Sequence, residues 1–270
     1  MSRKKEVIMD IPILFEDDCL FVVNKPPGIV VNRAESVKGE TIQDWVEDYL
    51  HLSSRPPSRD PASAKDGFRV KPGMTEVGSA SDFYSRAGIV HRIDKETSGC
   101  LLIAKRPDAF AELQRQFKER IVKKTYLAIA HGKIVPVEGE IRAPVGRLPW
   151  NRERFGIVPG GKEAVTRYKV LQGVVLHGKT TPYEVFSLVE LYPETGRTHQ
   201  IRVHLKYINH PIVGDYLYAG RKTARDDRTW ALRVMLHAWK ISFTHPVSGE
   251  TLAIEALIPD DMNTIIHGSS

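Results

Sequence analysis

The chain has 270 residues, of which 41% are hydrophobic and 8% aromatic, and its formal net charge at pH 7 is +6. A chain of this size buries about 70–75% of its unfolded surface, so it can form a core without disulfides or a structural metal. No stretch approaches the roughly 18 apolar residues of a membrane span, and the first residues lack a signal-peptide pattern. Cys19 and Cys100 lie in or beside apolar runs and form no CxxC pair, which is typical of reduced thiols. We therefore expect a soluble, cytoplasmic protein, and the modest basic excess is compatible with a polyanionic partner without establishing one.

The N-terminal part of the chain predicts two short strands before residue 26 and a helix over 41–52. The helix is indicated by apolar residues at helical spacing and by a capping-box pattern at Thr41 and Asp44. Residues 53–83, which follow, are rich in Ser, Pro, Gly and charged residues and lack apolar periodicity. We expect a polar insertion or a disordered loop there, rather than a domain boundary.

The sequence HRIDKETSG at 91–99 lies between two apolar runs, 87–90 and 100–105, that are typical of short strands. Asp94 is therefore expected at the end of a strand. A solvated turn is the ordinary explanation for charged residues between strands. The rest of the chain must decide whether Asp94 has a chemical role.

The remaining elements favour an α+β fold with a mixed, mostly antiparallel central sheet and flanking helices. Several strands follow one another without an intervening helix, which argues against a doubly wound sheet. Thr198 is a plausible N-cap for the helix expected over 198–210. We expect a single domain over 1–270. The expected elements are a helix over 106–122, strands over 123–132, 163–171 and 182–192, a helix over 198–210, and a hairpin over 236–258.

Two stretches rich in Arg and Lys, 143–162 and 219–228, are punctuated by Gly, Pro or Asp and resemble loops. Arg147 and Arg152 lie beside Trp150 in the first of them. Arginine next to an aromatic ring suits phosphate contact combined with base stacking. A solvated basic surface explains each stretch equally well when it is considered alone.

Three histidines near an aspartate in 195–215 raise the possibility of a zinc site. On a helix, however, His199 and His204 are about 140° apart around the axis, and on a strand they would face opposite sides. Local hydrogen bonding or packing is the better interpretation of His199, His204 and His210. No GxGxxG or P-loop sequence is present, so a nucleotide cofactor has no recognisable anchor.

Arg202 is adjacent to the apolar face of its predicted helix, where an unpaired cation is costly and a carboxylate partner is favoured. Asp94 is a candidate for that partner. A partly buried Asp–Arg pair favours the ionised carboxylate that a nucleophile or general base requires. The spacing of the two residues leaves their contact open.

Three segments, HRIDKETSGCLLIAK, KKTYLAIAHG and ETGRTHQIRVHLKYINHPIVGD, resemble in this order the signature motifs of the RluA-type pseudouridine synthases. The resemblance runs from ILFEDDCLFVVNKPPGIVV to the final hairpin and omits 53–83. It implies an RNA pseudouridine synthase with a central RNA-binding cleft, acting on uridines of ribosomal or transfer RNA. It also implies a monomer that needs no cofactor or metal and has no membrane partner. Because the pattern starts close to Met1, we expect no separate N-terminal RNA-binding domain.

The resemblance also assigns roles to individual residues. Asp94 matches the family's catalytic aspartate, Tyr126 its motif tyrosine, and Arg202 the salt-bridge partner of the aspartate. Ile201 matches an apolar residue beside the target base, and Arg92 an arginine that helps to displace the target nucleotide. Further candidates for substrate binding are His91, Arg147 and Arg152.

In the implied reaction the N1–C1′ bond of uridine breaks, the base turns, and C5 joins C1′. Asp94 would attack C1′ or take a ribose proton to give a glycal, and the sequence leaves both routes open. A non-catalytic RNA-binding module would not need Asp94, Tyr126 and Arg202 together. A metal-dependent hydrolase would need clustered histidines, which their spacing disfavours.

Overall fold

The structure is a computed structural model that describes residues 10–35, 37–51, 76–175 and 185–267. The strands are β1 (Ile13–Glu16), β2 (Leu20–Lys25), β3 (Ser98–Ala104), β4 (Lys123–His131), β5 (Glu138–Arg142), β6 (Val145–Leu148), β7 (Asn151–Ile157), β8 (Val165–Val175), β9 (Val185–Pro193), β10 (Leu236–Thr244) and β11 (Thr251–Glu255). The helices are α1 (Ile42–Tyr49), α2 (Glu76–Ser85), α3 (Pro107–Lys118), α4 (Gln200–Tyr207), α5 (Arg221–Asp227) and α6 (Asp260–His267). No helix in these ranges is both long and apolar enough to cross a membrane.

A mixed sheet forms the centre of the fold, as the strand pattern predicted. Its strand order is β1-β2-β3-β10-β4-β9-β8-β5, and β11 pairs with β10 outside this path. Within the described residues β3 and β10 form the one parallel pair, and the other pairs are antiparallel. A separate two-stranded sheet consists of β6 and β7. The α+β class and the mostly antiparallel sheet are confirmed.

The start of β3 approaches β10 so closely that only glycine fits there. Gly99 has φ +108°, and a Cβ atom at this position would lie 2.2 Å from the carbonyl oxygen of Ala238. Beside it, the Ser98 hydroxyl contacts Nδ1 of His237 at 2.9 Å. The serine and glycine that end HRIDKETSG therefore join the loop of Asp94 to the middle of the sheet.

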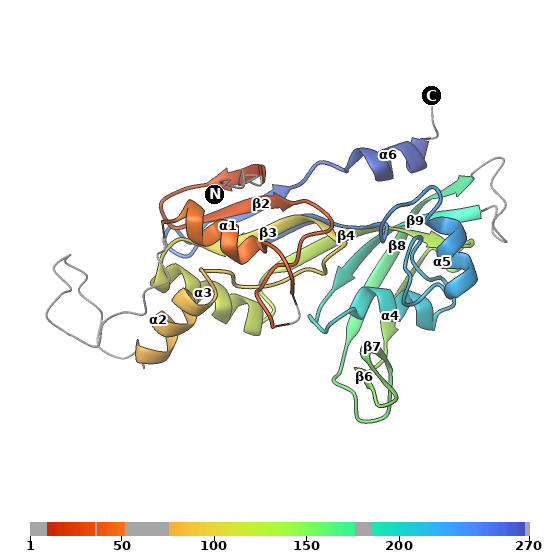
Figure 1. Cartoon of the computed structure of the whole chain (residues 1–270), viewed down its shortest axis with the longest axis horizontal. Coiled ribbons are helices and arrows are strands. Elements are labelled where there is room, and N and C mark those ends of the chain that lie inside the picture. The colour runs from red at the N-terminus through yellow and green to blue at the C-terminus, as the bar shows by residue number, and fades with distance from the viewer. Residues whose placement is uncertain (1–9, 36, 52–75, 176–184, 268–270) are drawn as a thin grey trace, which may run out of the picture.

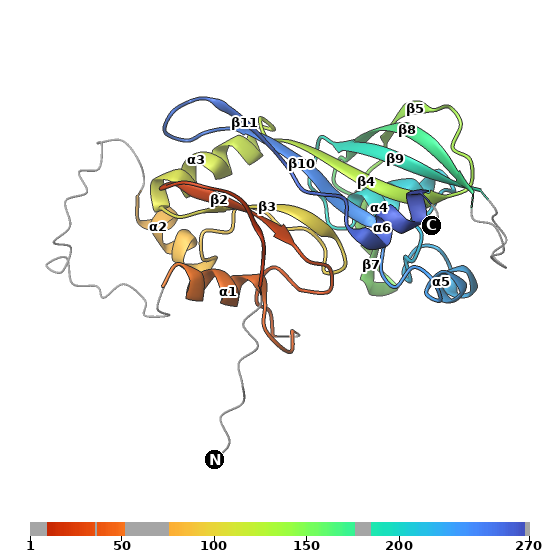
Figure 2. The same ribbon diagram turned by 90° about the horizontal axis from the view of Figure 1, so that it is seen from above.

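The helices form two groups on the sheet. Figure 1 shows α1, α2 and α3 at one end and α4 and α5 at the other, and Figure 2 shows β4 and β10 running between the two ends. Each end has its own packed core: Phe21, Leu101 and Phe110 are among the buried side chains of the first, and Phe186, Val189 and Leu205 of the second. Segments far apart in the chain consequently face each other where the two ends meet.

Several local predictions are confirmed. The capping box of α1 is present, because the Thr41 side chain accepts from the Asp44 amide and the Asp44 carboxylate accepts from the Thr41 amide. The helix expected over 106–122 is α3, whose apolar residues at helical spacing, among them Phe110 and Leu113, form a buried stripe. Cys19 and Cys100 are buried free thiols. The closing hairpin is formed by β10 and β11.

Other local predictions differ from the structure. Residues 53–75 of the expected insertion lie outside the described residues, but 76–83 belong to helix α2, where Phe83 is buried edge-to-face against Phe110. Residues 87–90 form no strand and make a single bridge, at Ile89. Tertiary contacts, rather than local periodicity, determine both segments.

Three further differences concern the second half of the chain. The expected loop at 143–162 is largely the β6–β7 hairpin, and that at 219–228 contains α5. Thr198 does not cap α4. The N-cap is His199, in the left-handed conformation, and the Gln200 side chain accepts instead from the amide of Arg197.

Candidate active site

A cavity of about 920 Å³ lies between the two ends of the sheet. Its walls come from the loop before β3, the C-terminal end of α3, β4, and the segment that leads from β9 into α4. Six of the eight residues predicted for the site line it: His91, Arg92, Asp94, Tyr126, Ile201 and Arg202. Arg147 is not among the lining residues, and the side chain of Arg152 lies outside the described part of the structure.

Asp94 and Arg202 form the predicted ion pair, with Nη1 of Arg202 3.0 Å from Oδ2 of Asp94. The other side of the guanidinium binds Asp215: Nε lies 2.7 Å from Oδ2 and Nη2 lies 2.9 Å from Oδ1. Burial alone would lower the pKa of Arg202, but Asp215 and then Asp94 raise it. One buried cation thus neutralises Asp215 and also holds Asp94, and the three charges together sum to −1.

The two oxygens of Asp94 have different surroundings. Oδ2 is held by Arg202, and Nε2 of His199 lies 3.9 Å from the same oxygen. No described residue forms a hydrogen bond to Oδ1, and the Asp94 side chain retains 22% of its exposure. One carboxylate oxygen is therefore anchored, while the other has no hydrogen-bond partner among the described residues, in a side chain that lines the cavity.

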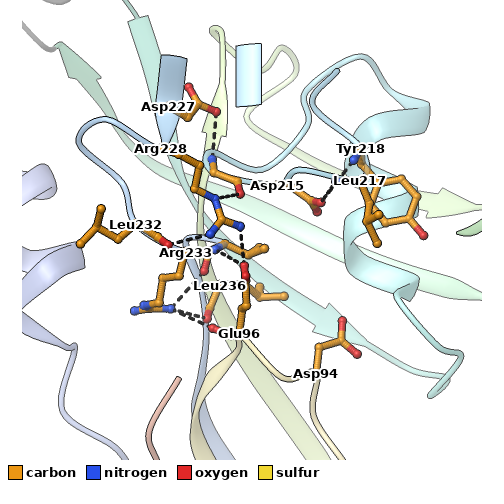
Figure 3. Close-up of polar contacts among 12 residues, drawn as sticks. Asp94, Glu96, Asp215, Leu217, Tyr218, Asp227, Arg228, Leu232, Arg233 and Leu236 are labelled. Carbon is orange, nitrogen blue, oxygen red and sulfur yellow. Dashed lines mark hydrogen bonds and ion pairs between the residues drawn. The ribbon is translucent and has the colours of Figure 1, made fainter. Parts of the chain in front are cut away.

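The loop that carries Asp94 is fixed at Glu96 by a network that Figure 3 displays. The Glu96 carboxylate accepts from Nη2 of Arg228 at 2.6 Å and from the Val234 amide at 3.0 Å. Arg228 also donates from Nε to the carbonyl of Gly214 at 2.8 Å, immediately before Asp215 in the chain. Arg228 thus connects the two chain segments that supply the carboxylates around Arg202.

A buried lysine fixes the same loop at Lys95. The ammonium of Lys25 lies 2.8 Å from the carbonyl of Pro26, 3.0 Å from that of Ile29 and 3.1 Å from that of Lys95. The Gly28 amide donates to the Lys95 carbonyl as well. Burial lowers the pKa of Lys25 to about 7. The KPPG turn is therefore bonded directly to the residue after Asp94.

Tyr126, on β4, provides the apolar floor of the cavity together with Ile201 on the first turn of α4. Tyr126 packs against both halves of the core. Burial, and then the charge of Asp94, raises the pKa of its hydroxyl further above the ordinary tyrosine value. At neutral pH the hydroxyl of Tyr126 keeps its proton, and the uncharged ring can pack against a base.

His91 and Arg92 differ in their availability to a substrate. The Nε2 atom of His91 accepts from the Leu102 amide at 2.9 Å, and its ring stacks on Phe117 at 4.8 Å. Burial lowers the pKa of His91 to about 3, so the ring is neutral. Arg92 is exposed on the cavity wall. Arg92 is thus free to meet a phosphate, whereas His91 supports β3.

Arg147 lies on the β6–β7 hairpin, away from Asp94. Its guanidinium lies over the ring of Phe155 at 5.2 Å, and Phe155 meets the ring of His199 edge-on at 5.6 Å. Trp150, in the turn of this hairpin, is 80% exposed. The hairpin therefore presents a basic and aromatic surface that is in contact with the cavity wall through Phe155.

The histidines of 195–215 do not form a metal site. His204 contacts the Thr166 hydroxyl and the Ala143 carbonyl, and His210 contacts the His131 carbonyl. Among the described residues one trio of possible ligands lies close together, formed by Asp17, Cys19 and His245. The Nδ1 atom of His245 accepts from two backbone amides and its Nε2 bonds Asp17, so both of its ring nitrogens are occupied.

Sequence reasoning missed several residues of the site. Asp215 was considered only as a zinc ligand, and Lys25 and Glu96 were not considered. The sequence does contain a signal for Lys25: a charged lysine ends an apolar strand and begins the KPPG turn, where a buried charge would need polar partners. No local pattern predicts that Asp215 pairs with Arg202, because the contact depends on how the chain returns after α4.

Comparisons with known proteins agree with this geometry. Residues 19–207 match the family described as RNA pseudouridylate synthase. The chain is 40% identical over 262 residues to the ribosomal large subunit pseudouridine synthase D of Neisseria meningitidis serogroup A, covering 94% of this chain and 60% of that protein. It is 38% identical to the RNA pseudouridine synthase YlyB of Bacillus subtilis, covering 96% and 73% of the two chains. The chain thus spans about 60% of the length of the Neisseria relative.

A solved structure has the same fold. The human RNA pseudouridylate synthase domain containing 1 superposes with a TM-score of 0.65 at 27% identity, covering 95% of this chain and 86% of that one. The family match, the sequence relatives and the paired Asp94 and Arg202 in the cavity lead to one conclusion: the chain belongs to the RNA pseudouridylate synthase family.

Proposed function

We propose that this chain isomerises uridine to pseudouridine in RNA, with Asp94 as the reacting carboxylate. The observation that carries the proposal is the asymmetry of Asp94, a cavity-lining residue whose Oδ2 is held by Arg202 while Oδ1 has no hydrogen-bond partner among the described residues. A nucleophile or base needs one oxygen free and a fixed position relative to the sugar. Because Arg202 carries one positive charge and contacts two carboxylates, Asp94, Asp215 and Arg202 together keep a net negative charge.

In this reaction the N1–C1′ bond breaks, the base turns, C5 bonds to C1′, and the proton lost from C5 is balanced by one gained at N1. Oδ1 of Asp94 either adds to C1′ or removes a ribose proton to give a glycal. Both routes require the same open oxygen. Tyr126 and Ile201 pack against the base as it turns, and the protonated Tyr126 hydroxyl is unsuited to act as a phenolate base in the free protein.

The substrate we propose is large-subunit ribosomal RNA, which is the substrate named for the relatives from Neisseria and Nitrosomonas. A target inside folded RNA must be extruded from its stack, at a cost of a few kcal/mol. Arg92 on the cavity wall and the β6–β7 hairpin, with Arg147, Arg152 and Trp150, supply cations and an aromatic ring that offset this cost. The proposal also includes a cytoplasmic location and a protein that acts as a monomer.

The test combines cells and purified components. Pseudouridines are mapped in ribosomal and transfer RNA from cells with and without the gene, and the protein is then incubated with transcribed large-subunit RNA. The expected result is a missing pseudouridine in ribosomal RNA and its restoration by the wild-type protein but not by Asp94→Asn. The variant should bind RNA within about tenfold of wild type, because it loses no phosphate contact.

Turnover by Asp94→Asn would refute the proposed role of Asp94. A pseudouridine missing only from transfer RNA would refute the ribosomal substrate and leave the chemistry intact.

A further inference from the structure

His199 lies next to the catalytic carboxylate although no part of the proposed reaction uses it. It is the N-cap of α4, with φ 56° and ψ 18°, a left-handed conformation that is uncommon for residues other than glycine. This conformation places the imidazole on the cavity wall, with Nε2 3.9 Å from Oδ2 of Asp94. A residue in such a conformation beside a reacting group is a candidate for a role in function.

The tautomer of His199 is determined by its neighbour Tyr218, a buried residue. The Phe155 amide donates to the Tyr218 hydroxyl at 3.1 Å, so the hydroxyl oxygen is an acceptor in that contact. The hydroxyl hydrogen then needs an acceptor of its own, and Nδ1 of His199, at 2.9 Å, is the one available among the described residues. Nδ1 therefore carries a lone pair, and a neutral His199 has its hydrogen on Nε2, the nitrogen nearest to Asp94.

The geometry points to His199 as a positioning residue for Asp94: a neutral imidazole, whose tautomer Tyr218 fixes, carries its hydrogen on Nε2, 3.9 Å from Oδ2, and its attraction adds to that of Arg202 in holding one carboxylate oxygen. This inference rests on the proposed role of Asp94. Arg202 holds Oδ2 from one side and the imidazole faces it from another. A partial rotation of the carboxylate would move the held oxygen away from both groups, so both favour the orientation that leaves the other oxygen for the substrate.

The neutral form of His199 matters because a second cation beside Asp94 would compete with Arg202 and weaken the carboxylate as a nucleophile or base. Burial is the largest influence on the pKa of His199 and lowers it, Asp94 and Asp215 act to raise it, and Arg202 and Arg92 lower it. The net result is a pKa below the ordinary histidine value. The titratable and charged groups around the His199 ring are Asp94, Asp215, Arg202, Arg92 and Tyr218.

The first experiment observes the tautomer directly. Nitrogen-15 NMR of protein labelled at histidine distinguishes a ring protonated at Nε2 from one protonated at Nδ1, and His199→Gln identifies the signal. We expect Nε2–H in the wild type at neutral pH. In Tyr218→Phe the Nδ1 lone pair loses its donor, so the pKa of His199 should rise and the preference for Nε2–H should weaken. A wild-type ring protonated at Nδ1, or a tautomer unchanged in Tyr218→Phe, would overturn the inference.

The second experiment measures single-turnover rates on the RNA substrate. Tyr218→Phe should lower the maximal rate by about tenfold with an unchanged RNA affinity, and its acid limb should move to higher pH. Tyr207→Phe, on α4 and exposed, is the matched control and should behave as wild type.

His199→Gln should retain more activity than His199→Ala, because glutamine keeps an N–H donor. Both variants place a Cβ atom in the same left-handed backbone, so strain cancels in their comparison. Equal rates for these two variants, or a wild-type rate in Tyr218→Phe, would overturn the inference. Activity in Asp94→Asn would instead show that the proposed role of Asp94, on which this inference rests, is wrong.

Discussion

Replacing Arg228 by methionine should both destabilise the protein and slow its reaction. Arg228 is the C-cap residue of α5 and donates to three acceptors: Glu96 Oε2 and the Leu232 carbonyl at 2.6 Å each, and the Gly214 carbonyl at 2.8 Å. The Glu96 ion pair is partly exposed, with side-chain exposures of 27% for Arg228 and 35% for Glu96, so it contributes at most about 1 kcal/mol. Each carbonyl contact contributes about 1 kcal/mol.

The variant should therefore lose about 2–3 kcal/mol of unfolding free energy, which lowers the melting temperature by about 5–10 °C in a chain of this size. The effect on rate has a different origin. Without Arg228, Glu96 and Gly214 lose the link that sets Asp94 and Asp215 on either side of Arg202. A displacement of about 1 Å can reduce a rate by about a hundredfold, so we expect a loss between tenfold and a hundredfold.

The assay is single-turnover conversion at saturating RNA, at a temperature where both proteins are folded by circular dichroism. Arg225→Met is the matched control, because Arg225 is on the same helix, is 76% exposed and pairs only loosely with Asp226 at 3.8 Å. It removes the same charge and should keep the wild-type rate. A normal rate in folded Arg228→Met would refute the reasoning that this link positions Asp94.

Three further predictions concern other parts of the molecule. Arg202→Met should abolish turnover, because Asp94 and the buried Asp215 lose their shared cation; near-normal turnover would show that the ion pair is dispensable. Lys25 has a folded pKa of about 7, below its unfolded value of about 10.4, so the unfolded state binds more protons between these values and stability rises with pH there. Denaturation should accordingly give a gain of about 1 kcal/mol from pH 7.5 to 8.5 in wild type and less in Lys25→Met, whereas parallel curves would contradict the lowered pKa. Trp150→Ala should weaken RNA binding by about 1–3 kcal/mol without changing the melting temperature, and unchanged binding would exclude the hairpin tip from the RNA interface.

The elements that could be predicted from the sequence are those whose stability is local. The capping box of α1 and the apolar stripe of α3 are patterns of residues three or four apart, and the structure reproduces both. The helix at residues 76–83 was not predicted, because its sequence has little amphipathic pattern. This helix packs through Phe83 on Phe110 instead.

The residues of the site that could be predicted are those for which the family motifs supplied a match. Asp94 and Arg202 are 108 residues apart, and their contact was anticipated from the family motifs. Asp215 was missed because its bidentate contact depends on the turn after α4. The position of His199 beside Asp94 was missed for a related reason: Thr198 resembles an ordinary N-cap, and nothing local indicates that the next residue takes a left-handed conformation.

The parallel contact between β3 and β10 has a consequence for the order in which the protein matures. Ser98 and Gly99 pair with His237 and Ala238, and the first of these pairs spans 139 residues. Contacts between such distant residues form slowly, because a long loop must close before they stabilise anything. During synthesis, strand β3, which follows the Asp94 loop, can therefore complete its pairing in the sheet only after β10 has been made. We therefore expect the strand that follows Asp94 to reach its final place in the sheet only after residue 238 has been synthesised.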